Sequence, residues 1–365
     1  MKILGIESSC DETAASVVED GYRILSNVVN SQIDIHKQYG GVVPEVAARS
    51  HIEVINPVIN KALQDASLSW ENIDGIAVTY APGLVGSLLV GTLAARTISL
   101  IRNIKLYPVH HIEAHVYANF LVEIGDGIRE MGNEKWEMPS RQPKFPILAL
   151  IVSGGHTQLV YFRNHGDYEI LGQTCDDAVG EAFDKVAKII GLPYPGGPSI
   201  SEAAKSGDPL AYKFPKAHMQ NAYDFSFSGL KTAVLRAIQQ EVGVDITFPS
   251  TGLAERLNDL QRNNFASSFQ RVAVETLVDK TVDAFYRFNP KSVIIAGGVA
   301  ANQELRRILK QRIPIDIEYA PINLCTDNAT MVACLGYYYA QKMPSIDPLE
   351  LEVYSSLSMN KTKWN

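Results

Sequence analysis

The fold is decided by a stretch near the start of the chain that occurs a second time further on. The first copy is ILGIESSCDETAASVVEDGYRIL (residues 3–25), and the second is ILALIVSGGHTQLVYFRNHGDYEIL (residues 147–171). Each copy consists of three apolar runs, separated by a polar or glycine-containing turn and then by a turn with Gly21 or Gly166. Apolar runs bounded by turn residues are typical of strands joined as hairpins. The matched order predicts a duplicated three-stranded meander.

After each meander the spacing of apolar residues changes to that of a helix. In the first half the pattern predicts a helix over 43–66, a strand over 73–79, a helix of small residues ending near 101, a strand over 105–109 and a helix from about His110. In the second half it predicts helices over 178–190, 230–241 and 254–288, a strand over 292–296, a helix over 302–312, a strand near 315–319 and a helix over 328–341.

A β-β-β-α-β-α unit that occurs twice indicates an α/β protein built from duplicated ribonuclease-H-like domains. This is the actin, Hsp70 and sugar-kinase (ASKHA) architecture, in which an interdomain cleft holds a nucleotide. Two unrelated α/β domains are the alternative. We expect residues 1–122 with about 324–343 to form the first domain and 146–323 the second. Residues 123–145 are predicted to be a linker or insertion, and 344–365 a loosely docked tail.

Composition and charge limit the classes of function. The 365 residues include 33 Lys and Arg against 40 Asp and Glu, a net charge of −7. This excludes a general nucleic-acid coat, so a nucleic-acid substrate would need a local basic surface or a partner. The four cysteines lie far apart, which argues against a disulfide framework or zinc knuckle. The chain opens with a strand-like run rather than a signal peptide, and the glycines and serines of the apolar stretch 84–101 fit a packed helix better than a membrane span. We therefore expect a cytoplasmic protein without membrane association.

A pair of histidines at helical spacing is the first chemical signal. His111 and His115 are four residues apart, so both imidazoles lie on one helix face and can reach one metal ion. Ile112 follows His111, so the glutamate that zinc proteases place there is absent. Asp327 is the best third ligand for a site of two histidines and one carboxylate. The alternatives are surface histidines at a helix start and, for Asp327, a helix N-cap.

Glycine-rich turns indicate a site for an anion or a flat ring. They occur at 153–155, at 196–198, and at 297–298 before Asn302, where a helix opens. Ordinary turns also use glycine, so each alone is a weak indication, whereas three in a duplicated α/β scaffold favour a nucleotide cleft. Asp184 is interpreted either as a ribose ligand or as part of an ion-paired helix face with Glu181 and Lys185. Glu12 lies at the first turn of the first copy. It is interpreted either as a residue that points toward the nucleotide site or as a carboxylate exposed to solvent.

Together these motifs resemble the TsaD family, the tRNA N6-adenosine threonylcarbamoyltransferases, which are also represented in the KEOPS complex. The matching stretches span about residues 1–340. They are GIESSCDET (5–13), YGGVVPE (39–45), PGLVG (82–86), HHIEAH (110–115), VSGGHT (152–157), GEAFDK (180–185), YPGGP (194–198), DFSFSGLK (224–231), GGVAAN (297–302) and CTDN (325–328).

The resemblance implies transfer of a threonylcarbamoyl group from threonylcarbamoyl-adenylate to N6 of adenosine 37 in tRNAs that read ANN codons, which forms t6A and releases AMP. It places the metal ligands on His111, His115 and Asp327, and favours Fe²⁺, with Zn²⁺ as the alternative. It places the substrate-binding residues on Ile151, Val152, Ser153, Gly154, Gly155, Asp184, Gly197 and Asn302. TsaB-like and TsaE-like proteins are the implied partners. From residue chemistry we add Glu12 as the group that positions or deprotonates the amine.

Other activities of the same fold are the alternatives. A small-molecule kinase or carbamoyltransferase would act without tRNA, and a non-catalytic scaffold paralogue would lack the two histidines and the aspartate. A metalloprotease is disfavoured by Ile112.

The helix after Asn302 carries four basic residues, Arg306, Arg307, Lys310 and Arg312, which form either a local basic rim or a solvated face. We therefore expect weak tRNA binding by the chain alone, strengthened by partners.

Overall fold

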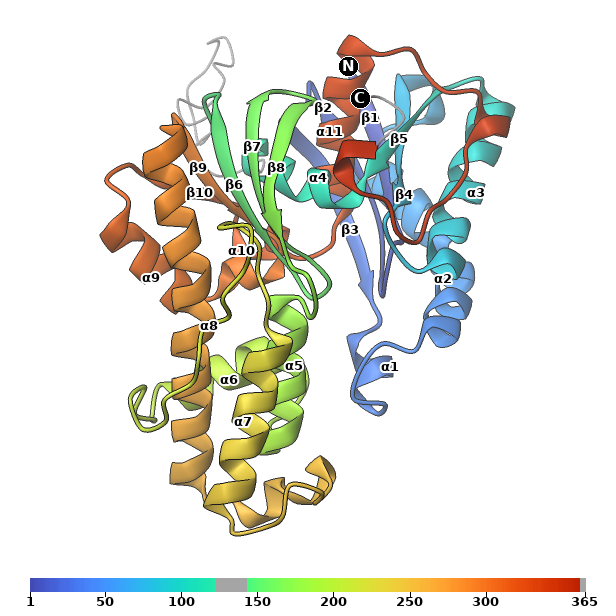
Figure 1. Cartoon of the computed structure of the whole chain (residues 1–365). Helices are drawn as coiled ribbons and strands as arrows, with labels where there is room; N and C mark the ends of the chain where they lie inside the picture. The colour runs from blue at the N-terminus through green and yellow to red at the C-terminus, as the bar shows by residue number, and fades with distance from the viewer. Residues whose placement is uncertain (123–142, 362–365) are drawn as a thin grey trace, which may run out of the picture. The chain divides into compact units, whose positions relative to one another are not determined.

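The computed structural model describes residues 1–122 and 143–361, and its contacts divide the chain into two compact units (Figure 1). Unit 1 comprises Met1–Lys144, Asn164–Asp167 and Ala320–Asn365, and unit 2 comprises Phe145–Arg163 and Tyr168–Tyr319. Most of the predicted linker, residues 123–142, lies outside the described residues.

Unit 1 contains a five-stranded sheet in the order β3-β2-β1-β4-β5. Its strands are β1 (Lys2–Glu7), β2 (Glu12–Glu19), β3 (Arg23–Ser31), β4 (Gly75–Ala81) and β5 (Lys105–His110). The first three form the predicted antiparallel meander, and β4 and β5 add parallel to β1. The parallel strands β1, β4 and β5 thus have their carboxyl ends at one edge, where Glu7 leads into the turn before β2 and His110 leads directly into the helix that begins at His111.

Helices cover both faces of this sheet. The helices of unit 1 are α1 (Ile33–Lys37), α2 (Pro44–Asp65), α3 (Val85–Arg102), α4 (His111–Tyr117), α10 (Ile322–Cys325) and α11 (Ala329–Lys342). Of these, α2 and α3 pack on one face of the sheet and α11 packs on the other. Leu4 and Ile6 share a core with residues of α2 and α3, whereas Gly5, on the opposite face, packs on α11. A Cβ on Gly5 would lie 2.2 Å from the carbonyl oxygen of Ala329, so α11 packs directly on the strand backbone.

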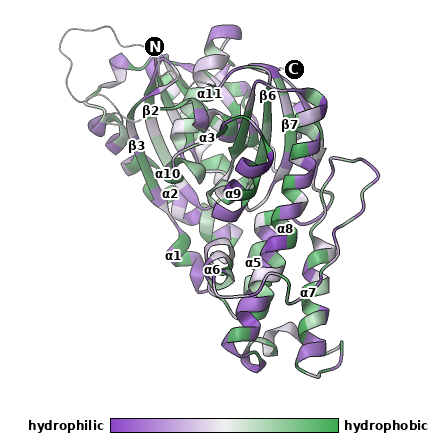
Figure 2. Cartoon of the chain, turned by 90° about the vertical axis from the view of Figure 1, so that its left-hand side faces the viewer, coloured by the Kyte–Doolittle hydropathy of each residue, from purple (hydrophilic) through white to green (hydrophobic). Residues whose placement is uncertain are grey.

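Unit 2 repeats the arrangement, with strand order β10-β9-β6-β7-β8. Its strands are β6 (Ile147–Val152), β7 (Thr157–Asn164), β8 (Asp167–Gln173), β9 (Ser292–Ala296) and β10 (Ile317–Tyr319). Its helices are α5 (Val179–Ile190), α6 (Gly196–Ala204), α7 (Ser228–Glu241), α8 (Asp259–Phe288) and α9 (Gln303–Arg312). β6 is buried throughout, and Figure 2 shows β6 and β7 coloured mainly as hydrophobic. The α/β fold with a duplicated meander is confirmed.

Most predicted boundaries lie within a few residues of the observed ones, and the exceptions have local causes. The helix predicted over 254–288 begins at Asp259, because Asn258 caps it and accepts a hydrogen bond from the amide of Gln261. Ala254–Arg256 forms a separate 3₁₀ turn. The glycine-rich turn at 196–198 is the start of α6, which was not predicted because glycine disfavours helices.

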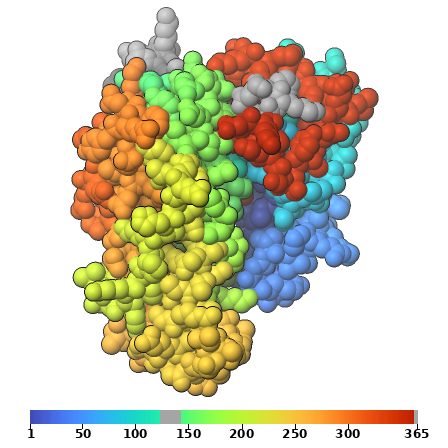
Figure 3. Space-filling view, in the orientation of Figure 1, coloured from blue at the N-terminus to red at the C-terminus, as the bar shows by residue number. Residues whose placement is uncertain are grey.

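The expectation of a loosely docked tail is wrong for the described residues after 344. The amide of Tyr354 donates to the carbonyl of Tyr80 at 3.0 Å, and His110 Nε2 lies 3.0 Å from the carbonyl oxygen of Leu357. Leu351 is buried and Met359 fully so. The space-filling view shows this C-terminal segment in red against the cyan residues of unit 1 (Figure 3). The tail is therefore an integral part of unit 1, held by backbone hydrogen bonds that side-chain periodicity does not reveal.

Candidate metal centre and substrate-binding residues

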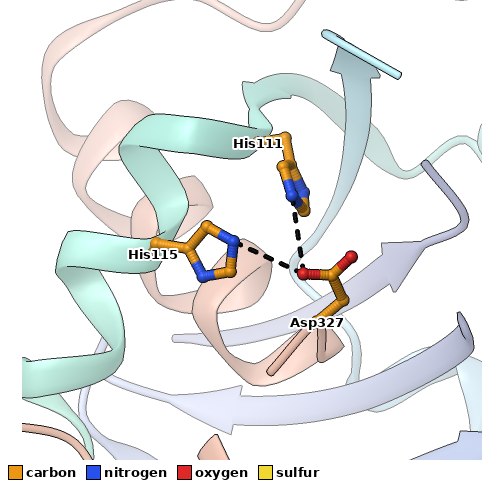
Figure 4. Close-up of side chains that lie close together, drawn as sticks. All are labelled: His111, His115 and Asp327. Atoms are coloured by element: carbon orange, nitrogen blue, oxygen red, sulfur yellow. Dashed lines mark ion pairs between the residues drawn. The ribbon is translucent and has the colours of Figure 1, made fainter. Parts of the chain in front are cut away.

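Helix α4 and the connection between α10 and α11, both in unit 1, bring the three predicted metal ligands together. His111 and His115 lie one turn apart on α4, and Asp327 lies in the connection between α10 and α11. Asp327 Oδ1 is 3.5 Å from His111 Nε2 and 3.4 Å from His115 Nε2 (Figure 4). One ligand atom from each side chain lies within 4.8 Å of the others. Residues 216 positions apart in sequence thus form one compact group with two nitrogen donors and one oxygen donor.

The N-cap of α11 explains why the Asp327 carboxylate can face the histidines. Asn328, not Asp327, caps the helix, and its side-chain oxygen accepts hydrogen bonds from the amides of Thr330 and Met331 at 3.1 and 3.2 Å. The interpretation of Asp327 as an N-cap is therefore wrong. Capping by the next residue satisfies the helix and leaves Asp327 outside it.

A buried carboxylate behind His111 was missed by the sequence analysis. Glu7 ends β1 and is fully buried, and its Oε2 lies 3.1 Å from His111 Nδ1. The hydroxyl of Ser9 is 3.2 Å from the same nitrogen. The signal in the sequence is a charged residue that ends an otherwise apolar strand, which is unusual unless the charge has a partner.

The electrostatics of this group favour a cation. Burial lowers the pKa of His111, but the carboxylates of Asp327 and Glu7 outweigh it and raise that pKa to about 9. Burial raises the pKa of Glu7, yet the charge and hydrogen bond of His111 bring the net pKa below its usual value. The two carboxylates that favour a proton on His111 would equally favour a divalent cation, whose binding requires that proton to leave.

His115 supports the same interpretation. It is 1% exposed, and neither ring nitrogen forms a hydrogen bond within the described residues, although Nε2 faces Asp327. A buried imidazole without hydrogen bonds is costly unless another ligand satisfies it. Two imidazoles and one carboxylate suit Fe²⁺ or Zn²⁺. The residues present therefore fit a divalent metal.

Glu12 begins β2, and the hydroxyl of Ser31 donates to its carboxylate at 3.0 Å. Burial, together with the charges of Asp327 and Asp11, raises the pKa of Glu12 to about 9. Burial and these two neighbouring charges thus favour the protonated form of the Glu12 carboxyl group. Glu12 is partly buried and electrostatically coupled to Asp327, which favours a role at this site over a carboxylate in open solvent.

A buried histidine holds the turn before Glu12. His51, on α2, has Nε2 at 3.0 Å from the carbonyl oxygen of Cys10, so this nitrogen must carry the proton. Its Nδ1 then accepts the hydrogen bond of the Thr13 hydroxyl at 2.7 Å. Burial lowers the pKa of His51, in keeping with a neutral ring. The Cys10–Thr13 turn is thus fixed from both ends by one side chain.

The predicted substrate-binding stretch 151–155 lies at the first turn of the second meander. Ile151 and Val152 are buried in β6, and the turn closes on itself through a hydrogen bond from the amide of Ser153 to the carbonyl of His156 at 2.9 Å. Gly154 and Gly155 are exposed, and a Cβ on either would meet nothing within 4 Å. Their backbone is therefore accessible to a ligand.

The other predicted substrate residues have structural partners in unit 2. Asp184 Oδ1 accepts a hydrogen bond from the amide of Gly196 at 2.6 Å, so it holds the start of α6. Glu181 pairs with Lys185 at 2.8 Å, on the same helix as Asp184. A Cβ on Gly197 would meet nothing within 4 Å, which leaves the first turn of α6 open.

Asn302 has both ends of its amide engaged. Its oxygen caps α9 by accepting from the amide of Leu305 at 3.0 Å. Its nitrogen donates to Ser201 Oγ at 3.1 Å and to Gln270 Oε1 at 3.0 Å. Asn302 therefore ties α6, α8 and α9 together. Gln270, which sequence analysis did not single out, accepts from both Ser201 and Asn302.

The basic residues of α9 are largely partnered. Arg307 pairs with Glu304 at 2.7 Å and Arg312 with Asp279 at 2.5 Å. The guanidinium of Arg306 lies over the ring of Tyr319, 3.9 Å from its centre. These contacts reduce the positive field that the helix presents to solvent.

Comparisons with known proteins show the family and the fold of this chain. The chain matches the family TsaD, tRNA N6-adenosine threonylcarbamoyltransferase, over residues 23–130 and 131–334. It is 47% identical to the tRNA N6-adenosine threonylcarbamoyltransferase of Thermomicrobium roseum, covering 98% of this chain and 97% of that protein. It is 51% identical to that of Symbiobacterium thermophilum, covering 92% and 91%. HypF of T. kodakarensis shares the fold, with a TM-score of 0.57 and 13% identity over 95% of this chain and 49% of that one.

Proposed function

The chain belongs to the TsaD family of tRNA N6-adenosine threonylcarbamoyltransferases, and from this premise we propose how its residues form t6A. The kinase, protease and scaffold alternatives have no support from the relatives. The observation that carries the proposal is the His111, His115 and Asp327 group, because it offers three metal-ligand atoms within 4.8 Å of one another.

We propose that this group holds one divalent metal, Fe²⁺ by family resemblance, with Zn²⁺ as the alternative. When bound, such a metal supplies Lewis-acid polarisation of a carbonyl oxygen. His111 and His115 would each contribute Nε2, and Asp327 would contribute Oδ1. Support comes from the buried ring nitrogens of His115, which form no hydrogen bonds within the described residues.

The donor substrate is proposed to be threonylcarbamoyl-adenylate. The N6 amine of adenosine 37 attacks the carbamoyl carbonyl, a new C–N bond forms, the bond from that carbon to the phosphate oxygen breaks, and AMP leaves. The amine gives up one proton in this exchange. We assign Glu12 to position the amine and take that proton, because its carboxyl group lies at the start of β2, is partly buried and is electrostatically coupled to Asp327.

In unit 2 we propose that the adenylate is bound by Ile151, Val152, Ser153, Gly154, Gly155, Asp184, Gly197 and Asn302. The open backbone at Gly154, Gly155 and Gly197 supports this, since amides without a facing side chain can donate to phosphate or ribose oxygens. Asp184 and Asn302 would act partly by holding the starts of α6 and α9 in place.

TsaB-like and TsaE-like proteins are the proposed partners, in the cytoplasm. Within residues 1–122 and 143–361, one helix, α3, is long and apolar enough to cross a membrane by length and composition, and it packs on α2 and β4. Its outward side, with neighbouring α2, exposes the apolar residues Ile52, Val85, Leu89, Leu93, Leu100 and Ile101. Such a face supports a protein partner, here the TsaB-like one. Leu93→Glu should abolish co-elution with it, and unchanged co-elution would contradict this surface.

The test of the proposed function is His111→Ala, assayed with tRNA, threonylcarbamoyl-adenylate and purified partners. We expect loss of bound metal and of t6A in the product tRNA. His218→Ala is the control, because His218 is exposed in unit 2 and should change neither. Undiminished t6A formation by His111→Ala would overturn the metal assignment.

A further inference from the structure

The two histidines of the metal group differ in what holds their rings. His111 Nδ1 lies 3.1 Å from Glu7 Oε2 and 3.2 Å from the hydroxyl of Ser9. His115 Nδ1 forms no hydrogen bond within the described residues. Within the described residues, of these two imidazoles only that of His111 is therefore oriented by a hydrogen bond at its Nδ1.

The carboxylate behind His111 is itself rigidly held. Glu7 Oε1 accepts a hydrogen bond from the amide of Ser9 at 2.6 Å, and Oε2 accepts one from the Thr79 hydroxyl at 2.5 Å. The side chain is fully buried where β1 ends, beside β4. Both oxygens have donors, so the carboxylate cannot rotate without losing them.

This geometry determines the tautomer of a neutral His111. An ionised carboxylate only accepts hydrogen bonds, so the ring nitrogen that faces it must carry the proton. With the proton on Nδ1, Nε2 presents a lone pair on the side of Asp327, 3.5 Å from its Oδ1. We propose that Glu7 is a positioning residue for the metal centre, which keeps His111 in the tautomer that binds through Nε2. This inference rests on the proposed metal site.

A purely structural role for Glu7 is the competing explanation. Its bonds to Ser9 and Thr79 join the β1 turn to β4 and would stabilise unit 1 even if His111 needed no orientation. The two explanations differ in one respect. A structural role affects the free energy of unfolding, whereas a positioning role affects the affinity for metal and the protonation of one ring nitrogen.

The first experiment is Glu7→Gln, with Zn²⁺ as the probe in competition with a chelating dye. The glutamine oxygen can still accept from the Ser9 amide, but its amide nitrogen would then donate toward His111 Nδ1. That forces the proton to Nε2 and blocks the metal. We expect Zn²⁺ affinity to fall about 10- to 100-fold. An unchanged affinity in a folded Glu7→Gln chain would overturn the proposal.

Thr79→Val is the matched control. It removes a donor to the same carboxylate but leaves the contact between Glu7 and His111. We expect lower stability with Zn²⁺ affinity within about 3-fold of the unmodified chain. A loss as large as that of Glu7→Gln would mean that any disturbance of the Glu7 pocket weakens the site, and would also overturn the proposal.

A second measurement needs no variant at Glu7. In the Zn²⁺-loaded chain with ¹⁵N-labelled histidine, His111 should show a protonated Nδ1 and an unprotonated Nε2, and assignment follows from the signal lost in His111→Ala. A proton on Nε2 would overturn the proposal even if Glu7→Gln fails to fold. If His111→Ala itself keeps full Zn²⁺ affinity, the proposed metal site fails, which is a distinguishable result.

Discussion

The two meanders share a backbone plan but end their first strands differently. β1 ends in Glu7, whose carboxylate reaches out of the meander to α4 and to β4. β6 ends in the buried Val152, and the turn that follows satisfies itself through Ser153 and His156. In the first copy, the side chain at the end of the strand therefore contacts other elements of the unit. The second leaves Gly154 and Gly155 exposed.

The same strand–turn–strand plan can therefore offer a ligand either fixed side chains or an open backbone. Where a strand ends in a buried charge, its neighbours must supply partners, and the result is a group of side chains fixed from several directions. Where it ends in a valine and glycines, the backbone itself stays accessible. Unit 1 thus suits a metal and acid–base chemistry, and unit 2 suits contacts to a ligand through backbone amides.

Two adjacent residues of unit 1, Asp327 and Asn328, should differ most in what their substitution does to metal binding and activity. Asp327→Asn removes a charged ligand but keeps the shape of the side chain, so we expect loss of bound metal and a fall of about 10³-fold in kcat for t6A formation. Asn328→Ala removes the cap of α11 and should cost about 1 kcal/mol of stability while metal binding persists. Metal content and urea denaturation of both variants check this. Metal loss in Asn328→Ala but not in Asp327→Asn would reverse the assignment.

A smaller difference, in stability, is expected between alanine substitutions at one glycine of each meander. Gly5→Ala would place a Cβ 2.2 Å from the backbone oxygen of Ala329, and we expect a loss of about 3 kcal/mol as α11 is displaced. Gly154→Ala has open space, so its stability should change by less than about 0.5 kcal/mol. If the turn approaches the adenylate, Gly154→Ala should instead raise the KM for that substrate. Equal destabilisation of the two variants would contradict the comparison.

The fold and the three metal-ligating candidates were predictable because local patterns carry them. Three apolar runs in matched order predict each meander, and the spacing of His111 and His115 predicts that they share a helix face. The CTDN stretch left the orientation of Asp327 open, because capping by Asn328 depends on where the helix begins.

Gln270, the docked tail and the partners of Glu7 were not predictable from local patterns, although the position of Glu7 at the end of an apolar strand marks it as unusual. Glu7 contacts residues 72 and 104 positions away, and Gln270 contacts residues 69 and 32 positions away. Whether a buried polar group is satisfied depends on such distant partners, and no period of the sequence encodes them. The tail is held largely through backbone groups, which every sequence possesses.

Substitutions of Asn302 should have smaller effects, and they test whether unit 2 binds its ligand through side chains as well as through backbone amides. Asn302→Ala removes the cap of α9 and two amide donations, so we expect a loss of about 2 kcal/mol. Asn302→Asp keeps the capping oxygen and loses the donors to Ser201 and Gln270. A raised KM for threonylcarbamoyl-adenylate in both variants, with kcat unchanged, would support a role in binding. Unchanged KM in both would restrict Asn302 to stability.

The smallest effect concerns the second turn of each meander. In the first copy, Asp20 pairs with the N-terminal ammonium of Met1 at 2.6 Å. In the second, His165 stacks on Tyr338 with ring centres 3.9 Å apart, and its Nδ1 lies 3.0 Å from the hydroxyl of Tyr117. Burial and the nearby Lys342 lower the pKa of His165 from 6.5 to about 4. This turn therefore depends on a neutral imidazole.

The sign of the pH dependence follows from that lowered pKa. Between pH 6.5 and 4 the unfolded chain binds a proton at His165 that the folded chain does not, so acidification favours unfolding. The contribution of the neutral His165 ring to the free energy of unfolding is complete above pH 6.5. We expect about 1 kcal/mol of this contribution to be lost by pH 5, given partial screening by solvent. His165→Asn, which can still accept from Tyr117, should flatten urea stability against pH in this range, whereas His218→Asn should not. An identical slope in all three chains would show that the stacked ring titrates normally, and that the second turns of the two meanders differ in sequence but not in their response to pH.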